Sequence, residues 1–380
     1  MSVTAPNQRA AEIIDRVSPE LPADAALRER FAGRDDIDPV TKRAIVRLVF
    51  SYYRWLRWLD ERESTTRRVS AAAELQTRFE TKPDSIKAEA LAERTVPAWI
   101  ADEMSPVPVS WLRQLQRDPA LWIRVQTEFA RSVPRALGDC VAADLSAFPG
   151  ATGATPTAFR YAGQKDLFRT DEFRKGLFEI QDLASQLVGH ACAPKAGETW
   201  WDTCAGEGGK MLHLADLMTN KGLIWASDRS ARRLTHLRKR AARAQVFNYR
   251  AVTWNGGPFL PTKTRFDGIL IDAPCSGVGT WQRNPHARWT TGLEDVRELA
   301  TLQSQLLEHV VPALKPGGRL VYAVCTLTRS ETTAVADAFT AAHPDFIPDP
   351  VLGGAPQLTL WPDQINANGM FIAAWRRTAS

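Results

Sequence analysis

The sequence predicts an α/β protein in which a doubly wound, mostly parallel sheet follows a helical region. From about Lys165 onward, short apolar runs alternate with segments long enough for a crossover helix, which is the pattern of βαβ units. The first 75 residues instead place apolar side chains at helical spacing. At 380 residues the chain is longer than a domain with a single hydrophobic core usually is, so we expect two or three domains.

We divide the chain into three segments, which are residues 1–75, 76–164 and 165–380. The first is helical, because Ala10 to Val17 and Ile45 to Leu59 carry apolar residues at helical intervals. The second mixes Trp-rich helical stretches with strand-like runs such as LWIRVQ and ends in the loop FPGATGATPTA, so we expect a small α/β linking subdomain. The third contains the strand candidates TWWDTC, LIWASD, DGILID, GRLVYAVC and MFIAAW.

Composition excludes several classes of protein. No apolar run is long enough to span a membrane, and the N-terminal residues lack the apolar region of a signal peptide, so we expect a cytoplasmic protein. The five cysteines include no CxxC pair, which argues against a disulfide framework and against a metal site. Any cysteine chemistry is therefore expected to be that of thiols.

Two basic stretches suggest a polyanionic partner without proving one. Arg229 to Arg250 contains eight Lys or Arg residues and no acidic residue, which fits either nucleic-acid binding or one solvated helix face. Aromatic residues alternate with arginines in the helix before residue 60, and such aromatics either stack on bases or form a core. They are Arg47, Tyr52, Tyr53, Arg54, Trp55, Arg57 and Trp58.

A glycine-rich loop follows the first strand of the predicted sheet. The residues Asp202-Thr203-Cys204-Ala205-Gly206-Glu207-Gly208-Gly209-Lys210 open a helix, and the glycines let a ligand approach the backbone. Asp228 ends the next strand, 26 residues after Asp202, where a carboxylate can accept hydrogen bonds from ribose hydroxyls. The combination favours a cofactor of the adenosine type.

Two cysteines follow other strands at the same predicted edge of the sheet. Asp272-Ala273-Pro274-Cys275-Ser276-Gly277 comes directly after DGILI, and Cys325 ends the run GRLVYAV. A single cysteine at a strand end is often inert and buried. Two of them beside an acid and a cofactor loop instead indicate a reactive pocket.

These motifs, in this order, resemble the RNA cytosine-C5 methyltransferase family of bacterial rRNA and eukaryotic tRNA enzymes. The resemblance rests on DTCAGEGGK, DAPCSG and VCTLTRSE, on FRKGLFEIQDLASQLVG at residues 173–189, and on the closing NGMFIAAWRR. ADAALRERFAGRD and LVFSYYRWLRWLD look similar to the NusB-like RNA-binding domain of the 16S rRNA branch. The resemblance implies a Rossmann-like, class I S-adenosylmethionine-dependent methyltransferase domain after a NusB-like region, with rRNA favoured over tRNA as the partner.

The resemblance also implies roles for particular residues. Cys325 attacks carbon 6 of the cytosine and Cys275 assists release of the product, while Asp272 lies at the edge of the base. The methionine end of S-adenosylmethionine lies along Cys204, Ala205, Gly206, Glu207, Gly208, Gly209 and Lys210. Asp228 binds its ribose, Asn255 and Asp272 complete the cofactor site, and Lys210 meets either the cofactor or the base. Phosphate contacts are expected from Arg283, Asn284, Pro285 and Arg288.

The chain departs from the family pattern at three positions. Glu207 precedes the paired glycines where the family has Ala-Pro, Asn255 replaces an acid near the adenine, and His286 replaces another acid. Because DNA cytosine-C5 methyltransferases carry their nucleophile in a Pro-Cys pair, Cys275 and Cys325 could exchange roles.

Three other functions stay open: a tRNA methyltransferase, a catalytically silent RNA-binding or ribosome-assembly protein, and a methyltransferase for a small molecule or a protein. The sequence shows no obvious dimerisation segment, so we take a monomer as the default.

Overall fold

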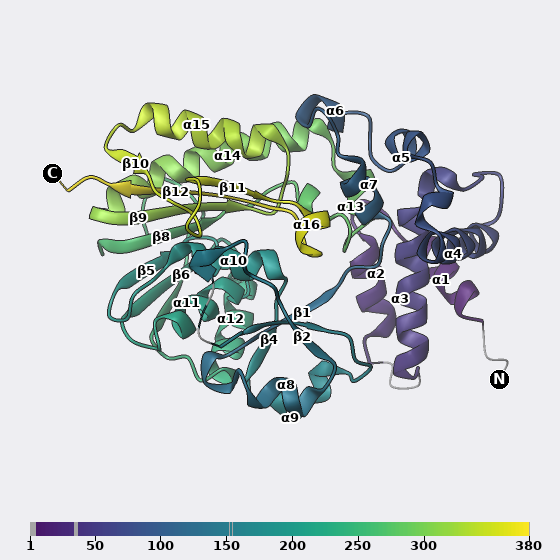
Figure 1. The fold of residues 1–380 in the computed structure, drawn as a ribbon, viewed down its shortest axis with the longest axis horizontal. Helices are drawn as coiled ribbons and strands as arrows, with labels where there is room; N and C mark the ends of the chain where they lie inside the picture. Colours follow the sequence, from purple (N-terminus) through teal and green to yellow (C-terminus); the bar gives the residue numbers. More distant parts are fainter. Residues whose placement is uncertain (1–4, 34–36, 152, 154, 380) are drawn as a thin grey trace. The chain divides into compact units, whose positions relative to one another are not determined.

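The computed structural model describes residues 5–33, 37–151, 153 and 155–379. The chain divides into two compact units, drawn in Figure 1. The helical unit contains Met1–Pro119 and Gly277–Leu293. The other unit contains Ala120–Ser276 and Glu294–Ser380, and we call it the catalytic unit because it holds the motifs that the sequence analysis expects to carry the chemistry. The three segments drawn from the sequence have other boundaries, and their independence stays a prediction. Within the described ranges, none of the helices is both long enough and apolar enough to cross a membrane.

The helical unit is built from short helices joined by turns. The longest two begin at well-formed caps: the Asp38 carboxylate accepts hydrogen bonds from the backbone N–H groups of Val40 and Thr41, and the Ser64 hydroxyl accepts one from that of Arg67. The predicted segment ADAALRERFAGRD forms α2, and its last two residues, Arg34 and Asp35, lie outside the described residues. The helices are α1 (Pro6–Ile14), α2 (Ala23–Phe31), α3 (Pro39–Arg54), α4 (Thr65–Thr81), α5 (Ala88–Arg94), α6 (Ile100–Glu103), α7 (Val109–Leu115) and α13 (Ala287–Thr290).

Three of the four aromatic residues predicted at the end of α3 form core rather than a base-stacking surface, and the fourth, Trp58, is half-buried against Trp55. Tyr52, Tyr53 and Trp55 are all buried, and Trp55 packs edge-on against Phe79 of α4 with ring centroids 5.5 Å apart. Arg54 is buried with them. These side chains cannot stack on RNA bases without unfolding the helices, so the core alternative holds.

A small antiparallel sheet opens the catalytic unit. Its strand order is β2-β3-β1-β4, from β1 (Leu121–Val125), β2 (Cys140–Ala142), β3 (Ala158–Tyr161) and β4 (Phe178–Ile180). Helices α8 (Ser132–Leu137) and α9 (Asp171–Arg174) lie in its connections. The predicted strand LWIRVQ is therefore β1, and its buried residues Ile123 and Val125 pack on Phe178 in a separate apolar cluster.

The large sheet confirms the predicted doubly wound α/β fold. Its eight strands follow the order β10-β12-β9-β8-β5-β6-β7, with β11 paired to β12. The pairs among β5 to β9 are parallel, whereas β12 pairs antiparallel with β9, β10 and β11. The strands are β5 (Thr199–Asp202), β6 (Leu223–Asp228), β7 (Tyr249–Thr253), β8 (Phe266–Asp272), β9 (Leu314–Val324), β10 (Phe346–Pro348), β11 (Gln357–Leu360) and β12 (Met370–Arg377).

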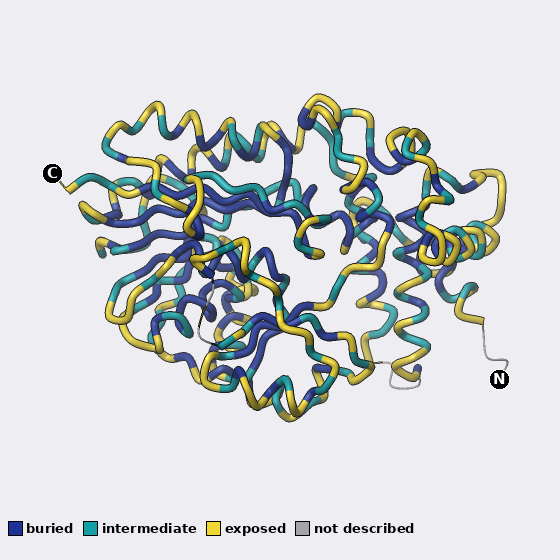
Figure 2. The backbone as a smooth tube through the Cα atoms, in the orientation of Figure 1, coloured by how far each residue is buried: buried dark blue, intermediate teal, exposed yellow. Residues whose placement is uncertain are grey.

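Helices cover both faces of the large sheet, as Figure 1 shows. Alternate side chains of each strand point to opposite faces, so Trp200 joins the core beneath α10 to α12 and Trp201 joins the core beneath α14 and α15. Burial on both faces explains why the strands are continuous apolar runs, drawn mostly dark blue in Figure 2. The helices are α10 (Leu183–Cys192), α11 (Gly209–Leu217), α12 (Ala231–Arg243), α14 (Leu293–Val310), α15 (Thr333–Ala342) and α16 (Pro362–Ile365).

Candidate functional site

A cavity of about 500 Å³ opens at the carboxyl ends of the parallel strands, within the catalytic unit. This edge is where an open α/β sheet binds its ligand. The cavity brings together most of the residues predicted from sequence. Its lining is Thr203, Cys204, Ala205, Gly206, Glu207, Asp228, Arg229, Arg233, Trp254, Asn255, Gly256, Asp272, Ala273, Pro274, Cys275, Leu302, Leu306 and Cys325.

The glycine-rich loop needs its glycines for two different reasons. Gly208 has φ +88°, and a Cβ there would lie 2.7 Å from Cγ of Leu237 on α12, so close packing and backbone conformation both require glycine. Gly206 has φ +54°, and a Cβ there would meet nothing within 4 Å. The backbone at Gly206 therefore faces open space at the cavity wall.

Asp228 at the end of β6 is fixed by backbone donors. One carboxylate oxygen accepts a hydrogen bond from the N–H of Gly206 at 3.0 Å, and the other accepts one from the N–H of Ser230 at 2.7 Å. The exposed Arg233 lies 3.9 Å from the same carboxylate. These contacts tie the glycine-rich loop to the next strand and hold the carboxylate at the cavity.

Asn255 lies at the cavity where the resemblance expects contact with the adenine. Its side-chain oxygen accepts a hydrogen bond from the N–H of Gly257 at 3.0 Å, which closes a local turn. The amide NH₂ is then the part of Asn255 suited to meet a ligand. The neighbouring Trp254 is buried against Trp201.

Lys210 and Asp272 form an ion pair beside the cavity. Lys210 Nζ lies 2.6 Å from Asp272 Oδ2, and the lysine is nearly buried. Burial works to lower the pKa of Lys210, but the Asp272 carboxylate, helped by Cys325, raises that pKa above its ordinary value. A buried donor and acceptor thus lie together next to the thiols.

The two strand-end cysteines converge. Cys275 Sγ lies 3.3 Å from Cys325 Sγ, and both residues line the cavity. Cys204 also lines it, but burial raises the pKa of its thiol to about 12, so this cysteine is poorly suited to nucleophilic chemistry.

Asp202 entered the sequence analysis only as part of the loop motif, yet it is a fully buried acid next to the site. Its side chain is fully buried at the end of β5, and neither carboxylate oxygen has a hydrogen-bond partner among the described residues. Burial, followed by the negative charge of Asp272, raises the pKa of Asp202 to about 8.

Sequence reasoning gave no role to Glu331 or Gln303, and it placed Arg229 and Arg233 only in the basic stretch, not at the cofactor site. Arg229 and Arg233 line the cavity, while Glu331 and Gln303 are buried and contact the Cys275 loop. The signal for Glu331 was present, since it ends the quoted motif VCTLTRSE. Gln303 lies in the middle of α14, where no local pattern distinguishes it from other helical residues.

The segment after Cys275 does not provide the phosphate site expected of Arg288. The arginine is fully buried in the helical unit and donates to the carbonyls of Thr95 and Leu115, at 2.9 and 3.1 Å, and to the Gln116 side chain at 3.2 Å. Arg288 is therefore a structural residue, and the prediction of a phosphate contact was wrong for it. Arg283 is exposed and keeps that role as a prediction.

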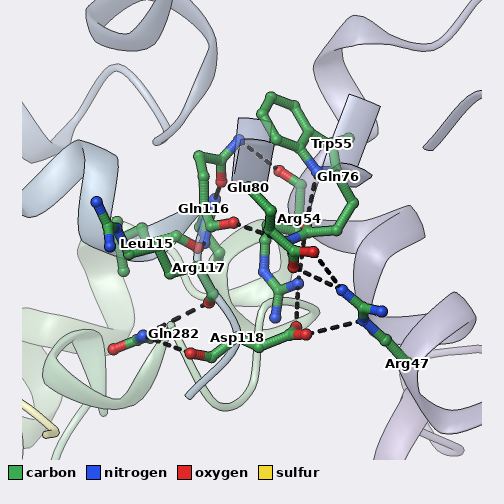
Figure 3. A network of polar contacts seen from close by, with 11 residues as sticks. Arg47, Arg54, Trp55, Gln76, Glu80, Leu115, Gln116, Arg117, Asp118 and Gln282 are labelled. Atoms are coloured by element: carbon green, nitrogen blue, oxygen red, sulfur yellow. Dashed lines mark hydrogen bonds and ion pairs between the residues drawn. The ribbon is translucent and has the colours of Figure 1, made fainter. Parts of the chain in front are cut away.

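The neighbours of Arg288 belong to a polar network of the helical unit (Figure 3). Asp118 accepts hydrogen bonds from Arg47 at 2.9 Å and from Arg54 at 2.8 Å, and Gln282 donates to the backbone carbonyl of Asp118 at 3.3 Å. His286, which replaces an acid of the family pattern, packs edge-on against Tyr53 with ring centroids 4.7 Å apart. Residues 277–293 are thus integrated into the helical unit.

The basic stretch from Arg229 to Arg250 is only partly available to a partner. Arg240 and Arg243 pair with Glu179 of β4 at 2.8 and 2.5 Å. The other six are exposed, and they are Arg229, Arg232, Arg233, Arg238, Lys239 and Arg250.

Three solved structures share this fold. A crystal structure of PH0851 matches with a TM-score of 0.77 and 22% identity, covering 99% of this chain and 100% of that chain. A methyltransferase homolog protein from Pyrococcus horikoshii matches with a TM-score of 0.61 and 26% identity over 73% and 92%. NSun6 from Pyrococcus horikoshii, solved with SFG, matches with a TM-score of 0.58 and 22% identity over 71% and 94%.

Sequence comparison identifies the family. The profile described as 16S rRNA methyltransferase RsmB/F matches residues 190–376. The chain is 36% identical to the probable ribosomal RNA small subunit methyltransferase B of Bacillus subtilis over 55% of this chain and 49% of the relative, so it spans about half the length of that relative. It is 32% identical to the ribosomal RNA small subunit methyltransferase B of Shewanella oneidensis over 77% of this chain and 69% of the relative. The chain therefore belongs to the RsmB/F family of 16S rRNA methyltransferases.

Proposed function

We propose that the protein transfers a methyl group from S-adenosylmethionine to carbon 5 of a cytosine in 16S rRNA, with Cys325 as nucleophile and Cys275 as the group that assists release. The observation that carries the proposal is the pair of thiols, 3.3 Å apart, lining one cavity beside the Lys210–Asp272 ion pair. A methyltransferase whose target atom is already nucleophilic needs no thiol to activate that atom, and therefore no pair of adjacent thiols.

The residues present fit the cofactor of this family. At Gly206 an added Cβ would enter open space, so the loop backbone is accessible to a ligand, and Asp228 is held ready for hydroxyl donors. We assign the methionine end to residues 204–210, the ribose to Asp228 and the adenine to the amide of Asn255. When bound, S-adenosylmethionine supplies an electrophilic methyl group on a sulfonium centre.

The nucleophile solves a specific chemical difficulty. Carbon 5 of cytosine is weakly nucleophilic while the ring is aromatic. Addition of the Cys325 thiolate to carbon 6 breaks the aromaticity and makes carbon 5 enamine-like, so one difficult step becomes two easier ones. Lys210, buried near Cys325, supplies the positive charge that favours a thiolate.

The Lys210–Asp272 pair is suited to the edge of the base. As the thiolate adds, negative charge develops toward ring nitrogen 3, and this nitrogen takes up a proton that the Lys210 ammonium passes on through Asp272. Asp272 is partly exposed to the cavity whereas Lys210 lies behind it, 2.6 Å away. We therefore assign base contact to Asp272 and support of Asp272 to Lys210.

Release requires elimination. After methylation, the Cys275 thiolate accepts the proton of carbon 5, the carbon 5–carbon 6 double bond re-forms, and the sulfur–carbon 6 bond breaks to return the Cys325 thiolate. Cys275 lies close enough to Cys325 to contact the same base and assist this step.

Trapping of the adduct tests the chemistry. Wild type, Cys275→Ala and Cys325→Ala are incubated with S-adenosylmethionine and unmodified RNA and run on a denaturing gel, with Cys192→Ala, a buried cysteine outside the cavity lining, as the matched control. We expect a slow-migrating, ribonuclease-sensitive adduct that accumulates in Cys275→Ala only. An adduct in Cys325→Ala alone would exchange the two roles, and no methyl transfer by wild type would favour a silent RNA-binding protein.

The RNA target is tested separately. The relatives are named for ribosomal RNA of the small subunit, and the exposed basic residues along α12 suit an RNA partner. We expect labelled methyl groups from S-adenosylmethionine in unmodified 16S rRNA at carbon 5 of cytosine. Labelling of a tRNA pool without labelling of 16S rRNA would make this a tRNA enzyme.

A further inference from the structure

Glu331 is a buried carboxylate in the catalytic unit that the proposed chemistry does not use. It lies in the loop after β9, six residues beyond Cys325, and it is fully buried. Among the residues that the structure describes, no lysine, arginine or histidine forms an ion pair with the Glu331 carboxylate. A buried charge of this kind is costly unless hydrogen bonds compensate it.

The hydrogen bonds of Glu331 join the two cysteine loops. From the Cys275 loop, the Ser276 backbone N–H donates to Oε1 at 2.8 Å and the Ser276 hydroxyl donates to Oε2. From the Cys325 loop, the hydroxyls of Thr326 and Thr328 donate to Oε2 at 3.2 and 2.8 Å. One side chain therefore connects the residues directly after both thiols.

Gln303 of α14 completes the cluster. Its amide NH₂ donates to Glu331 Oε1 at 3.0 Å and to the carbonyl of Pro274, the residue before Cys275, at 2.8 Å. The Tyr322 hydroxyl has two acceptors within reach, the backbone carbonyl of Glu331 at 2.6 Å and the Gln303 side-chain oxygen at 2.9 Å. The two acceptors of the NH₂ group fix the orientation of the Gln303 amide. Backbone on both sides of Cys275 is therefore held by the same buried cluster.

We propose that Glu331 is a positioning residue that sets Cys275 against Cys325, so that Cys275 can assist elimination of the Cys325 adduct. The proposal rests on the proposed function, because it concerns how that same site releases its product. Five donors converge on the two carboxylate oxygens, and charge-assisted bonds of this type are stronger than those between neutral groups. Glu331, rather than either loop alone, then fixes the distance between the two sulfur atoms.

A carboxylate is required at this position. An ionised glutamate accepts hydrogen bonds at both oxygens, whereas a glutamine accepts at one atom only. Its NH₂ would face either the N–H of Ser276 and the NH₂ of Gln303, which cannot accept, or the hydroxyls, which would then lose their charged acceptor. Glu331→Gln therefore preserves the shape of the side chain but removes the charge and one of the two acceptors, so the Cys275 loop is held less firmly. A misplacement of about 1 Å at a reacting group costs about 100-fold in rate.

The distance between the thiols can be measured without RNA. Phenylarsine oxide binds two adjacent thiols, forming two sulfur–arsenic bonds and releasing water. We expect wild type to bind the arsenical through Cys275 and Cys325, and Glu331→Gln to bind about 100-fold more weakly. Ser276→Ala removes only the hydroxyl donor and should weaken binding by about tenfold. Asp267→Asn is the matched control, since Asp267 contacts Thr199 and Lys315 at the other end of β8.

The release step supplies the second measurement. In single-turnover reactions we expect Glu331→Gln to accumulate the ribonuclease-sensitive adduct seen in Cys275→Ala, because addition by Cys325 proceeds while elimination slows by about 100-fold. A variant that was merely less stable would lose adduct and product together. Circular dichroism confirms folding of each variant, and Ser276→Ala keeps the test valid if Glu331→Gln does not fold.

The outcomes separate the two proposals. If Cys275→Ala forms no adduct, the proposed function fails, and the arsenical still reports on the thiol geometry. If Cys275→Ala forms the adduct but folded Glu331→Gln binds the arsenical and releases product like Asp267→Asn, the assignment of Glu331 is overturned. Normal arsenical binding and release by Ser276→Ala would overturn it in the same way if Glu331→Gln does not fold.

Discussion

Two buried cations of this protein are stabilised in opposite ways. Lys210 in the catalytic unit lies 2.6 Å from a carboxylate at the cavity, whereas Arg288 in the helical unit is surrounded by three neutral acceptors. Burial works against both charges, but the pKa of Lys210 is raised by Asp272, while burial, with the charge of Arg54, lowers the pKa of Arg288 to about 9.

The difference distinguishes a reactive group from a structural one. The planar guanidinium of Arg288 distributes several hydrogen bonds among carbonyls from separate chain segments, which fixes backbone without needing a counter-charge. Lys210 is a compact charge with one carboxylate partner that itself faces the cavity. We therefore expect loss of Lys210 to affect chemistry and loss of Arg288 to affect folding.

The largest effect is expected from Lys210→Met. Removal of the cation leaves Asp272 and Cys325 without their positive neighbour, so single-turnover methyl transfer should fall by about 10³-fold. The exposed Lys221 provides the control Lys221→Met. A Lys210→Met variant that kept its rate but had a lower free energy of unfolding than wild type would reverse the comparison.

Arg288→Met should lower stability rather than chemistry. It leaves three acceptors unsatisfied in the core of the helical unit, which costs about 3 kcal/mol of the free energy of unfolding. Urea denaturation followed by tryptophan fluorescence measures the loss, and Arg288→Lys should recover only part of it because lysine lacks the planar fork. An unchanged free energy of unfolding would show that Arg288 is not structural.

A third buried group, Asp202, extends the comparison of buried charges, because it makes the free energy of unfolding depend on pH. Its folded-state pKa is raised to about 8, so the unfolded chain loses this proton near pH 4 while the folded chain retains it. The contribution of Asp202 to stability is therefore fully present below about pH 4 and is lost as pH rises toward 8. We expect Asp202→Asn to be less sensitive to pH between 4 and 8 in urea melts, and parallel curves for both proteins would contradict the assignment.

The smallest effect is expected from the exposed Arg283. If it contacts one phosphate, Arg283→Ala should weaken RNA binding a few-fold and reduce the slope of log affinity against log salt by about 1. Filter binding at several salt concentrations provides both numbers, with the exposed Arg62→Ala as the control. If the slope of log affinity against log salt did not change, the predicted phosphate contact of residues 283–288 would be rejected.

The sequence predicted the strand-end residues well and the packed ones poorly. Asp228, Asp272, Cys275 and Cys325 lie at the predicted edge of the sheet because each ends or follows a buried strand, and the carboxyl ends of parallel strands share one edge. Their roles stay predictions. Arg288 was misassigned because an arginine three residues after a proline looks the same in sequence whether its side chain faces solvent or backbone carbonyls.

The partners of buried residues come from distant parts of the chain, which local patterns do not show. The acceptors of Arg288 lie more than 170 residues earlier in the sequence, and the donors to Glu331 come from three separate segments. The aromatic residues of α3 were left open between a core and a binding surface for the same reason. Only the fold decided that Tyr52 and Trp55 are core.

The integration of residues 277–293 into the helical unit has a consequence for dissection of the molecule. The chain leaves the catalytic unit after Ser276 and re-enters it at Glu294, so the helical unit is not a removable N-terminal extension. Truncation at Pro119 would leave Trp281 without Trp99 and Trp111, and Arg288 without its acceptors. A shortened protein would then expose hydrophobic side chains immediately after its Cys275 loop, and such a surface promotes aggregation. Residues 277–293 would have to be replaced before the fragment could be purified in soluble form.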